Sequence, residues 1–541
     1  RTPVLSTGTT QTFTNDQMSV NSPSLSCDAL PCAKNDLVGR PTQVTDSRPA
    51  QKDRVDALFR GAKLILRHHG APTRVILSYR TQLFGYLNVE EELVFFARAK
   101  YLLAFYEAWF LRNELPPPPD AAWIPRGAWR RWSKSRRFYT RKNSHLWYSF
   151  LQTKRSALPA SEGIVLDNLK KHRKAMENLD SIGDELRGDI LYHLRPILDV
   201  VRQRVREAKG LGELKHSASE RACFENSRSD GGAKEALLDL VEDKTEISGE
   251  IFKREEKGTC HLGTLEKYVT SVTYYPVVRY KGLIHEHVCA VNSLDGDSYS
   301  TWNQVLKEEV SRLDLSKPLQ CSVYGILEPL KVRIITKGPA LPYYFAKPLQ
   351  RVLHDSLRKM DCFRLIGRPL CPTDLMDVSA NPVLCGEGPL EWMSVDYSAA
   401  TDMLSASLSS EILKYVIQDL PIEDQKVYLS VLAPHRCTYP KVILGDGSEV
   451  RLPSVNQKNG QLMGSILSFP ILCLANLGLY LKVVEDDPRR LREKLKGVLV
   501  NGDDMLYQAP QSVFYEHTRL GNEVGLVMTL GKAYHHARFA M

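Results

Sequence analysis

The sequence predicts an α+β protein, because helical and strand-like patterns both occur along its 541 residues. Apolar residues recur at helical spacing over 54–112 and 163–209. Strand-like runs appear at 268–280 and 286–292, and a further short run ends at Val395. The chain is long for a single hydrophobic core, so two to four subdomains are expected.

Composition divides the chain further. Residues 1–53 are rich in Ser, Thr, Pro and Asp without periodicity, which predicts a disordered or loosely attached segment. A mainly helical region follows over 54–259, and mixed segments occupy 260–375 and 376–541. The hydrophobic content of 43% and the charged content of 25% are those of a soluble globular protein.

Charge and cysteine usage restrict the class of protein. The net charge of +9 favours a polyanionic partner. The 11 cysteines form no C-x-x-C pair, so we expect the reduced thiols of an intracellular protein, cytoplasmic or else mitochondrial, and not of a secreted one. The apolar run 462–481 is long enough to span a bilayer, but its Gly, Ser, Pro and Asn residues favour a core helix entered through a loop.

The most basic stretch is 126–142, RGAWRRWSKSRRFYTRK, in which aromatic residues are interleaved with the charges. Basic side chains neutralise phosphates and aromatic faces stack on bases. Arg130, Arg131, Arg136 and Arg137 are therefore candidate RNA-binding residues. A solvated basic face whose aromatic residues turn into the core explains the same pattern.

The segment 500–508, VNGDDMLYQ, places Asp503 and Asp504 side by side between two strand-like runs. Adjacent carboxylates repel each other, so the pair requires either open water, as in an exposed hairpin turn, or a cation. Upstream, Asp396 directly follows a short strand and Asp402 lies near the start of a helix, so both are expected to face the same cleft. Converging acids predict a Mg²⁺ site for phosphoryl displacement, although a lone acid after a strand also suits a helix N-cap.

Basic and small residues accompany these acids. Lys331, Arg333 and Lys337 lie in a strand-like segment that presents them on one side, either toward a triphosphate or as the protective charges of an edge strand. The segment 459–476 begins with a glycine-serine loop that lets backbone approach a ligand closely, although an ordinary loop before a core helix has the same composition. Lys532 follows another apolar run and is a candidate general acid.

Taken in order, these motifs closely resemble those of viral RNA-dependent RNA polymerases. The chain contains LKVRIITKG, VDYSAATD, GQLMGSILSF and NGDD, followed by a late glycine-lysine, within about residues 320–535. The wording is similar to that of the botourmiavirus (ourmia-like) group, whose wider relatives are narnaviruses, mitoviruses and RNA-phage replicases. The resemblance implies template-directed RNA synthesis from ribonucleoside triphosphates, with two Mg²⁺ ions, or Mn²⁺ in their place, as cofactors.

The resemblance also implies a right-hand polymerase. Its palm would be an antiparallel sheet built from 376–428 and 456–541, with helical fingers from 260–375 and the insertion 429–455. Family members continue into a thumb, whereas this chain ends soon after its glycine-lysine motif, so the thumb is expected to be truncated or absent. The alternatives are an inactive truncated copy, a reverse transcriptase, or a non-enzymatic RNA-binding protein that acts through 126–142.

Position by position, the resemblance implies a role for each motif residue. Asp396 and Asp503 would be the principal metal ligands with Asp504 beside them, and Asp402 would sense the ribose hydroxyls of the incoming nucleotide. Asn476 departs from the common motif spacing and is assigned no sugar contact. The remaining roles surround the nucleotide: Arg333, Lys337 and Lys331 on the triphosphate, Gly464 and Ser465 in the adjoining loop, Ser468 where many relatives carry threonine, and Lys532 as the acid.

Overall fold

The computed structural model describes residues 51–111, 131, 146, 149–208, 219–258, 269–280, 288–290, 306–529 and 533–540. The chain divides into residues 1–47 and Arg48–Met541, and every element below belongs to the second unit. Helices and mainly antiparallel sheets both occur, in agreement with the predicted α+β class. In this part of the chain, no helix is both long and apolar enough to cross a bilayer.

Three helices form the first part of this unit. α1 (Gln51–His68), α2 (Thr73–Leu87) and α3 (Glu92–Leu111) share one apolar core with Leu330 and Val332 from a later hairpin. The helical pattern predicted for 54–112 is confirmed, but α1 begins within the segment 1–53 that was expected to be loosely attached. The rest of that segment lies outside the described residues.

The helical pattern over 163–209 is confirmed, and it corresponds to two helices, α6 (Glu162–Glu177) and α7 (Asp184–Glu207). The strand-like runs that follow are confirmed as well. They correspond to β2 (Val269–Tyr280) and β3 (Val288–Ala290), which form a three-stranded antiparallel sheet with β1 (Thr245–Gly258). The helix α8 (Gly232–Lys244) precedes this sheet.

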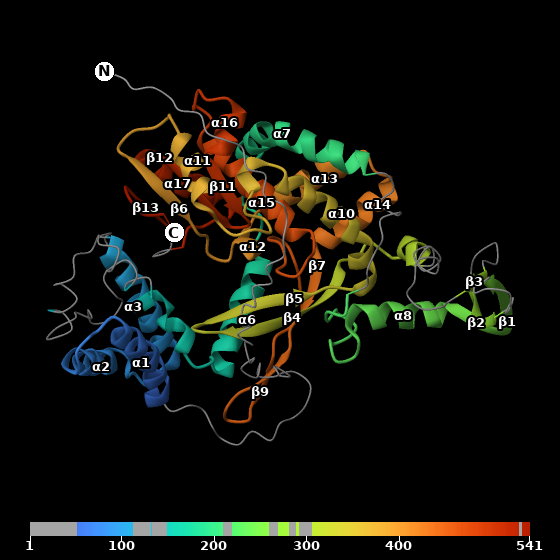
Figure 1. Cartoon of the computed structure of the whole chain (residues 1–541), viewed down its shortest axis with the longest axis horizontal. Helices are drawn as coiled ribbons and strands as arrows, with labels where there is room; N and C mark the ends of the chain where they lie inside the picture. The colour runs from blue at the N-terminus through green and yellow to red at the C-terminus, as the bar shows by residue number, and fades with distance from the viewer. Residues whose placement is uncertain are drawn as a thin grey trace, which may run out of the picture. The chain divides into compact units, whose positions relative to one another are not determined.

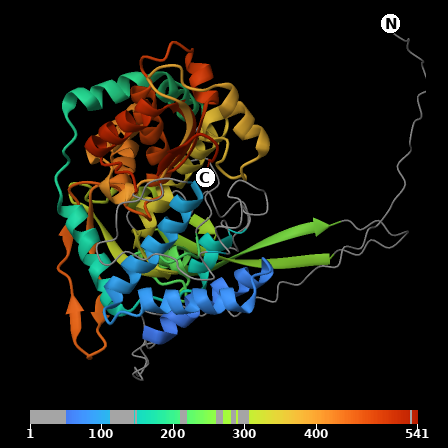
Figure 2. The same cartoon turned by 90° about the vertical axis from the view of Figure 1, so that its left-hand side faces the viewer.

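A second sheet contains the basic motif. β4 (Leu319–Glu328) and β5 (Lys331–Lys337) form a hairpin, β7 (His435–Thr438) runs parallel to β4, and β10 (Val455–Asn456) completes the order β10-β7-β4-β5. α6 packs across this sheet (Figure 1). Two strands of segment 429–455 therefore share a sheet with strands that precede residue 375, and the assignment of both segments to fingers stays a prediction. The separate hairpin of β8 (Lys441–Ile443) and β9 (Glu449–Arg451) extends beyond the sheet (Figure 2).

A third, fully antiparallel sheet contains the acidic motifs in the order β11-β12-β6-β13. One of its faces packs on the main core, and the other carries a small cluster of Val378, Leu499 and Leu506. Val378 comes from α11 (Pro372–Ala380), which runs across the predicted boundary between 375 and 376. The strands are β6 (Leu390–Val395), β11 (Val498–Asn501), β12 (Asp504–Pro510) and β13 (Tyr534–His536).

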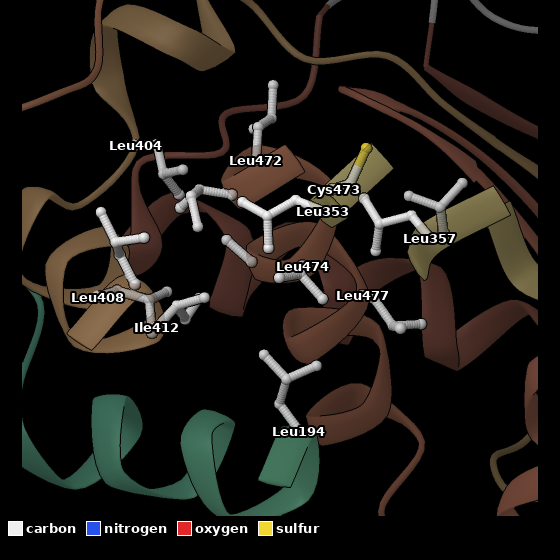
Figure 3. Packing of buried hydrophobic residues seen from close by; sticks show 14 of the residues in the cluster. Leu194, Leu353, Leu357, Leu404, Leu408, Ile412, Leu472, Cys473, Leu474 and Leu477 are labelled. Carbon is white, nitrogen blue, oxygen red and sulfur yellow. The ribbon is translucent and has the colours of Figure 1, made fainter. Parts of the chain in front are cut away.

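The main core surrounds α15 (Ser468–Val483), nearly all of whose residues are buried. A helix that is apolar on every side must be enclosed by other elements, and this one is. Figure 3 shows its leucines among those of three neighbouring helices: α7, α10 (Ala340–Arg358) and α13 (Ala406–Ile417). The apolar run 462–481 is thus a core helix entered through a loop.

Candidate active site

The acidic pair lies at the tip of a hairpin, as predicted. Asn501 pairs with Asp504, so Gly502 and Asp503 form a two-residue turn between β11 and β12. Gly502 has φ +72°, which suits glycine at the first central position of such a turn. A Cβ atom at Gly502 would lie 3.2 Å from the Phe469 ring, so both the backbone and the neighbouring side chain favour glycine here.

Strand register brings Asp396 next to this tip. β6 and β12 are antiparallel with Val395 opposite Met505, so the following residue, Asp396, lies at the position opposite Asp504. Side chains alternate between the faces of a sheet, which places Asp396 and Asp504 on one face. Both residues line a cavity of about 910 Å³.

Asp503 is placed differently from its neighbour. It is partly buried and is not among the residues that line this cavity. Burial raises the pKa of Tyr397 well above its ordinary value, and the charge of Asp503 raises it further. Asp503 therefore lies close enough to Tyr397 to influence the pKa of its hydroxyl, whereas Asp504 lines the same cavity as Asp396.

Two of the three predicted cations also line the cavity. Lys331 and Arg333 lie on the same face of β5, and Arg333 forms an ion pair of 2.9 Å with Glu328, another cavity residue. The Lys337 ammonium lies 3.9 Å from the centroid of the Tyr324 ring, away from the cavity lining. The hairpin thus presents positive charge beside the two carboxylates.

The glycine-serine loop contacts the strand β5 through Thr336. The Thr336 N–H donates to the Met463 carbonyl at 3.0 Å, and a Cβ atom at Gly464 would collide with the Thr336 carbonyl. Ser465 Oγ donates to the Val431 carbonyl at 2.7 Å. Ser468 is buried at the start of α15, and its hydroxyl has no hydrogen-bond partner among the described residues. None of the three predicted loop residues lines the cavity that holds Asp396.

Asp402 lies on the single-turn helix α12 (Ala400–Met403). Burial raises the pKa of its carboxyl to about 7, and the positive charge of Lys331 partly opposes this rise. Asp402 does not line the cavity itself, but the effect of Lys331 connects it to the cavity wall. At neutral pH this carboxyl is therefore partly protonated and able to donate as well as accept a hydrogen bond.

One face of α15 holds the acidic turn in place. Asn476 donates to the Gly502 carbonyl at 3.0 Å and to the Asp503 carbonyl at 3.5 Å, and the Gly502 N–H donates to Cys473 Sγ at 3.3 Å. Cys473 and Asn476 are three positions apart, which puts them on one side of the helix. The sequence assigned no role to Asn476. The sequence does contain an indication of this role, because Asn476 is an amide within an otherwise apolar run, and a buried amide requires hydrogen-bond partners.

A buried hydrogen-bonded chain continues from Asn476. Its Oδ1 lies 2.9 Å from the Tyr397 hydroxyl, which is 2.8 Å from His517 Nε2, and His517 Nδ1 is 2.8 Å from the Tyr507 hydroxyl. Burial lowers the pKa of His517 to about 3, so its ring is neutral and carries one N–H.

One proton arrangement satisfies every contact of this chain. The Tyr507 hydroxyl donates to His517 Nδ1, His517 Nε2–H donates to the Tyr397 oxygen, and the Tyr397 hydroxyl donates to Asn476 Oδ1. The Asn476 amide is then free to donate to the acidic turn. This series of hydrogen bonds links Tyr397, which directly follows Asp396, to the hairpin tip that carries Asp503 and Asp504.

The donors in the cavity suit a hard divalent cation. Mg²⁺ is commonly held by one or two carboxylates together with water and substrate phosphates, which Asp396 and Asp504 can provide for. In the described ranges no group of three or more His, Cys, Asp or Glu side chains is arranged to hold a metal ion. The three-carboxylate site expected from the sequence therefore stays a prediction.

Several predicted residues lie outside the described ranges. These are Lys532 and, in the basic stretch, Arg130, Arg136 and Arg137. Arg131 is described and exposed, as both interpretations of that stretch require.

No family model matches the chain. It is similar to the RNA-dependent RNA polymerase of Ourmia melon virus (isolate Melon/Iran/VE9), with 28% identity over 458 residues. The match covers 80% of this chain and 49% of the relative, so the chain spans about half the length of the curated relative. The match is longer than the segment 320–535, so the similarity includes residues upstream of the motifs.

Proposed function

We propose that this chain carries the catalytic region of a viral RNA-dependent RNA polymerase. The main support is the placement of Asp396 and Asp504 at matched ends of β6 and β12, in one cavity with Lys331 and Arg333. Nucleotidyl transfer needs carboxylates for divalent cations and basic groups for a triphosphate in the same site. The similarity to a viral polymerase is the second support.

The proposed reaction joins a ribonucleotide to a growing RNA strand. The 3′-hydroxyl oxygen attacks the α-phosphorus, the bond from this phosphorus to the bridging oxygen breaks, and pyrophosphate leaves. Mg²⁺ or Mn²⁺ would favour deprotonation of the hydroxyl and neutralise charge on the phosphates. Asp396 and Asp504, with Asp503 beside them, would hold these ions, and Lys331 and Arg333 would bind the triphosphate.

The other motif residues have supporting roles in this proposal. Asp402, partly protonated near pH 7, would hydrogen-bond to ribose hydroxyls and so favour ribonucleotides. Lys532 would give a proton to the leaving pyrophosphate. Lys337 and the loop residues Gly464, Ser465 and Ser468 do not line the cavity. They would support the wall that binds the nucleotide.

The proposal also covers partners and location. The partners are an RNA template, the product strand and ribonucleoside triphosphates. Cysteines whose side chains the structure describes are free thiols, which suits the intracellular location that we propose.

Incorporation of labelled ribonucleotides on an RNA template with Mg²⁺ or Mn²⁺ tests the proposal. We expect Asp396→Asn and Asp504→Asn each to lower the rate on the order of 100-fold or more, because each removes a charged oxygen donor from the site. Asp486→Asn, which changes an exposed acid elsewhere, is the matched control. Unchanged incorporation in both site variants would overturn the proposal.

The same assay separates the alternative functions. Preference of the wild-type protein for deoxynucleotides would indicate a reverse transcriptase. RNA binding without any incorporation by the wild-type protein would indicate a non-enzymatic RNA-binding protein or an inactive copy.

A further inference from the structure

The cavity of the candidate active site has a wall that no motif predicted. Its lining includes Lys100 on α3, and Lys154 and Arg155 on the short 3₁₀ helix η1 (Gln152–Ser156). All three precede the segment 320–535, in which every motif lies. The N-terminal helical region therefore contributes side chains to the same cavity as Asp396 and Asp504.

Packing fixes this wall relative to the basic hairpin. Leu330 and Val332 of the β4–β5 hairpin belong to the apolar core of α1, α2 and α3. η1 packs on α1, where Gly61 leaves room for the Ser156 side chain. Thr153 is buried, with its hydroxyl donating to the Phe150 carbonyl at 2.8 Å. The backbone that carries Lys154 and Arg155 is thus held by side-chain packing and hydrogen bonding.

The two side chains themselves are exposed and available. Within the described ranges neither Lys154 nor Arg155 forms an ion pair, whereas Arg333 on the facing hairpin is paired with Glu328. Two exposed cations that line a cavity without an acidic partner are suited to an anionic ligand.

The charge balance of the cavity points to the same ligand. Its lining contains five cations, namely Lys100, Lys154, Arg155, Lys331 and Arg333, and three acids, namely Glu328, Asp396 and Asp504. The acids suited to a divalent cation lie on the sheet, and η1 adds two cations to those of the hairpin. Phosphate groups suit such a cavity, because their oxygens bind both divalent cations and basic side chains.

We propose that Lys154 and Arg155 form a phosphate-binding site for the nucleic-acid substrates of this cavity. The inference rests on the proposed function, because it takes the carboxylate edge as the reaction centre. The phosphates belong either to the incoming ribonucleoside triphosphate or to the RNA strand. Arg155 offers a planar fork of donors for phosphate oxygens, and Lys154 adds a second positive charge.

Direct binding tests the site without any need for catalysis. The probes are a fluorescent non-hydrolysable ribonucleoside triphosphate and a short fluorescent single-stranded RNA, each titrated with the double variant Lys154→Ala/Arg155→Ala. The matched control is Lys52→Ala/Arg60→Ala, which removes the same two charges from exposed positions on α1 outside the cavity lining. Equal melting temperatures of the two variants check that both are folded.

We expect the cavity variant to weaken binding of one probe on the order of tenfold relative to the control. If the phosphates belong to RNA, the slope of log K against log salt should become shallower by about 0.7 for each phosphate that the variant no longer neutralises. If they belong to the triphosphate, nucleotide binding should weaken while RNA binding stays unchanged. The exchanged variant Lys154→Arg/Arg155→Lys should retain most of the affinity.

Equal affinity of the cavity variant and the control for both probes would overturn this inference. Its failure is distinguishable from failure of the proposed function. A wild-type protein that incorporates no nucleotide, but loses affinity in the cavity variant alone, would retain the phosphate site and overturn only the polymerase activity.

Discussion

The side-chain amide of Asn476 donates a 3.0 Å hydrogen bond to the backbone carbonyl of Gly502. This contact joins α15, nearly all of whose residues are buried, to the turn that carries the paired acids. Because Cys473, on the same helix, accepts from the Gly502 N–H, both polar groups of Gly502 are bound by side chains of α15. The position of Asp503 and Asp504 therefore depends on a helix that contributes no acid itself.

Replacement of Asn476 by aspartate should loosen this turn. Asn476→Asp replaces an amide donor by an oxygen that faces the Gly502 carbonyl, and it buries a carboxyl group. We expect a loss of about 1–3 kcal/mol in the free energy of unfolding and a fall in kcat on the order of tenfold. Thermal melting and nucleotide incorporation measure the two effects.

The control for this change is Asn456→Asp, an identical replacement at an exposed residue of β10. It should leave melting temperature and kcat near those of the wild-type protein. If Asn476→Asp behaves like this control, the amide does not position the turn.

Glycine at 502 should be required for two separable reasons. Gly502→Ala places a side chain at φ +72° and 3.2 Å from the Phe469 ring. Gly447→Ala has the unfavourable backbone conformation without the crowding, because Gly447 has φ +80° and open space around it. The left-handed backbone costs about 1–2 kcal/mol at either position, and crowding adds roughly 1–3 kcal/mol at 502. Chemical denaturation compares the variants, and equal losses would exclude the contribution of the ring.

His517 should make the fold sensitive to acid. Its folded-state pKa is about 3 because it is buried, while an unfolded histidine titrates near 6.5. Between these values the unfolded chain binds a proton that the folded chain does not. The free energy of unfolding should therefore fall as pH is lowered below 6.5, by up to about 1.4 kcal/mol per pH unit.

His517→Gln should remove this part of the pH dependence. Melting temperatures at pH 5 and pH 7 measure it, and some slope should remain because burial also lowers the pKa of His172 and His435 to about 4. His68→Gln, the same replacement at an exposed position, is the matched control. An unaltered slope in His517→Gln would contradict the assignment of a neutral buried ring.

Asp402 should give the opposite dependence. Because burial raises its folded-state pKa to about 7, the folded chain keeps a proton that the unfolded chain releases above about pH 4. The free energy of unfolding should fall as pH rises from about 4 to 7. Asp402→Asn should therefore become more stable relative to the wild-type protein between pH 5 and pH 8.

Two further variants examine the cause of this shift. Lys331→Ala removes the charge that opposes it, so the stability loss should extend to higher pH. Asp486→Asn, which changes an exposed acid, is the matched control for Asp402→Asn. A parallel curve for Asp402→Asn would show that the Asp402 carboxyl is not retained in its neutral form.

Much of the local structure was predictable because it depends on short-range patterns. An Asn-Gly pair between two strand-like runs predicts a hairpin, and the hairpin of β11 and β12 is present. The apolar run before it predicts a core helix, although α15 begins only at Ser468. The loop of Gly464 and Ser465 before this helix passes beneath β5 and outside the cavity lining, a path set by its contact with Thr336.

The sequence by itself determined which residues carry acid, base and turn chemistry, and the order in which they follow one another. Tertiary structure decided which of them share a cavity. Strand pairing places Asp504 on the face of Asp396, because side chains alternate and register is a property of two strands together. Helix packing brings Asn476 to Gly502 and brings Lys154 and Arg155 into the cavity wall. Contacts between residues so far apart in the chain leave no local pattern, because they arise only when separate hydrophobic faces are buried against each other.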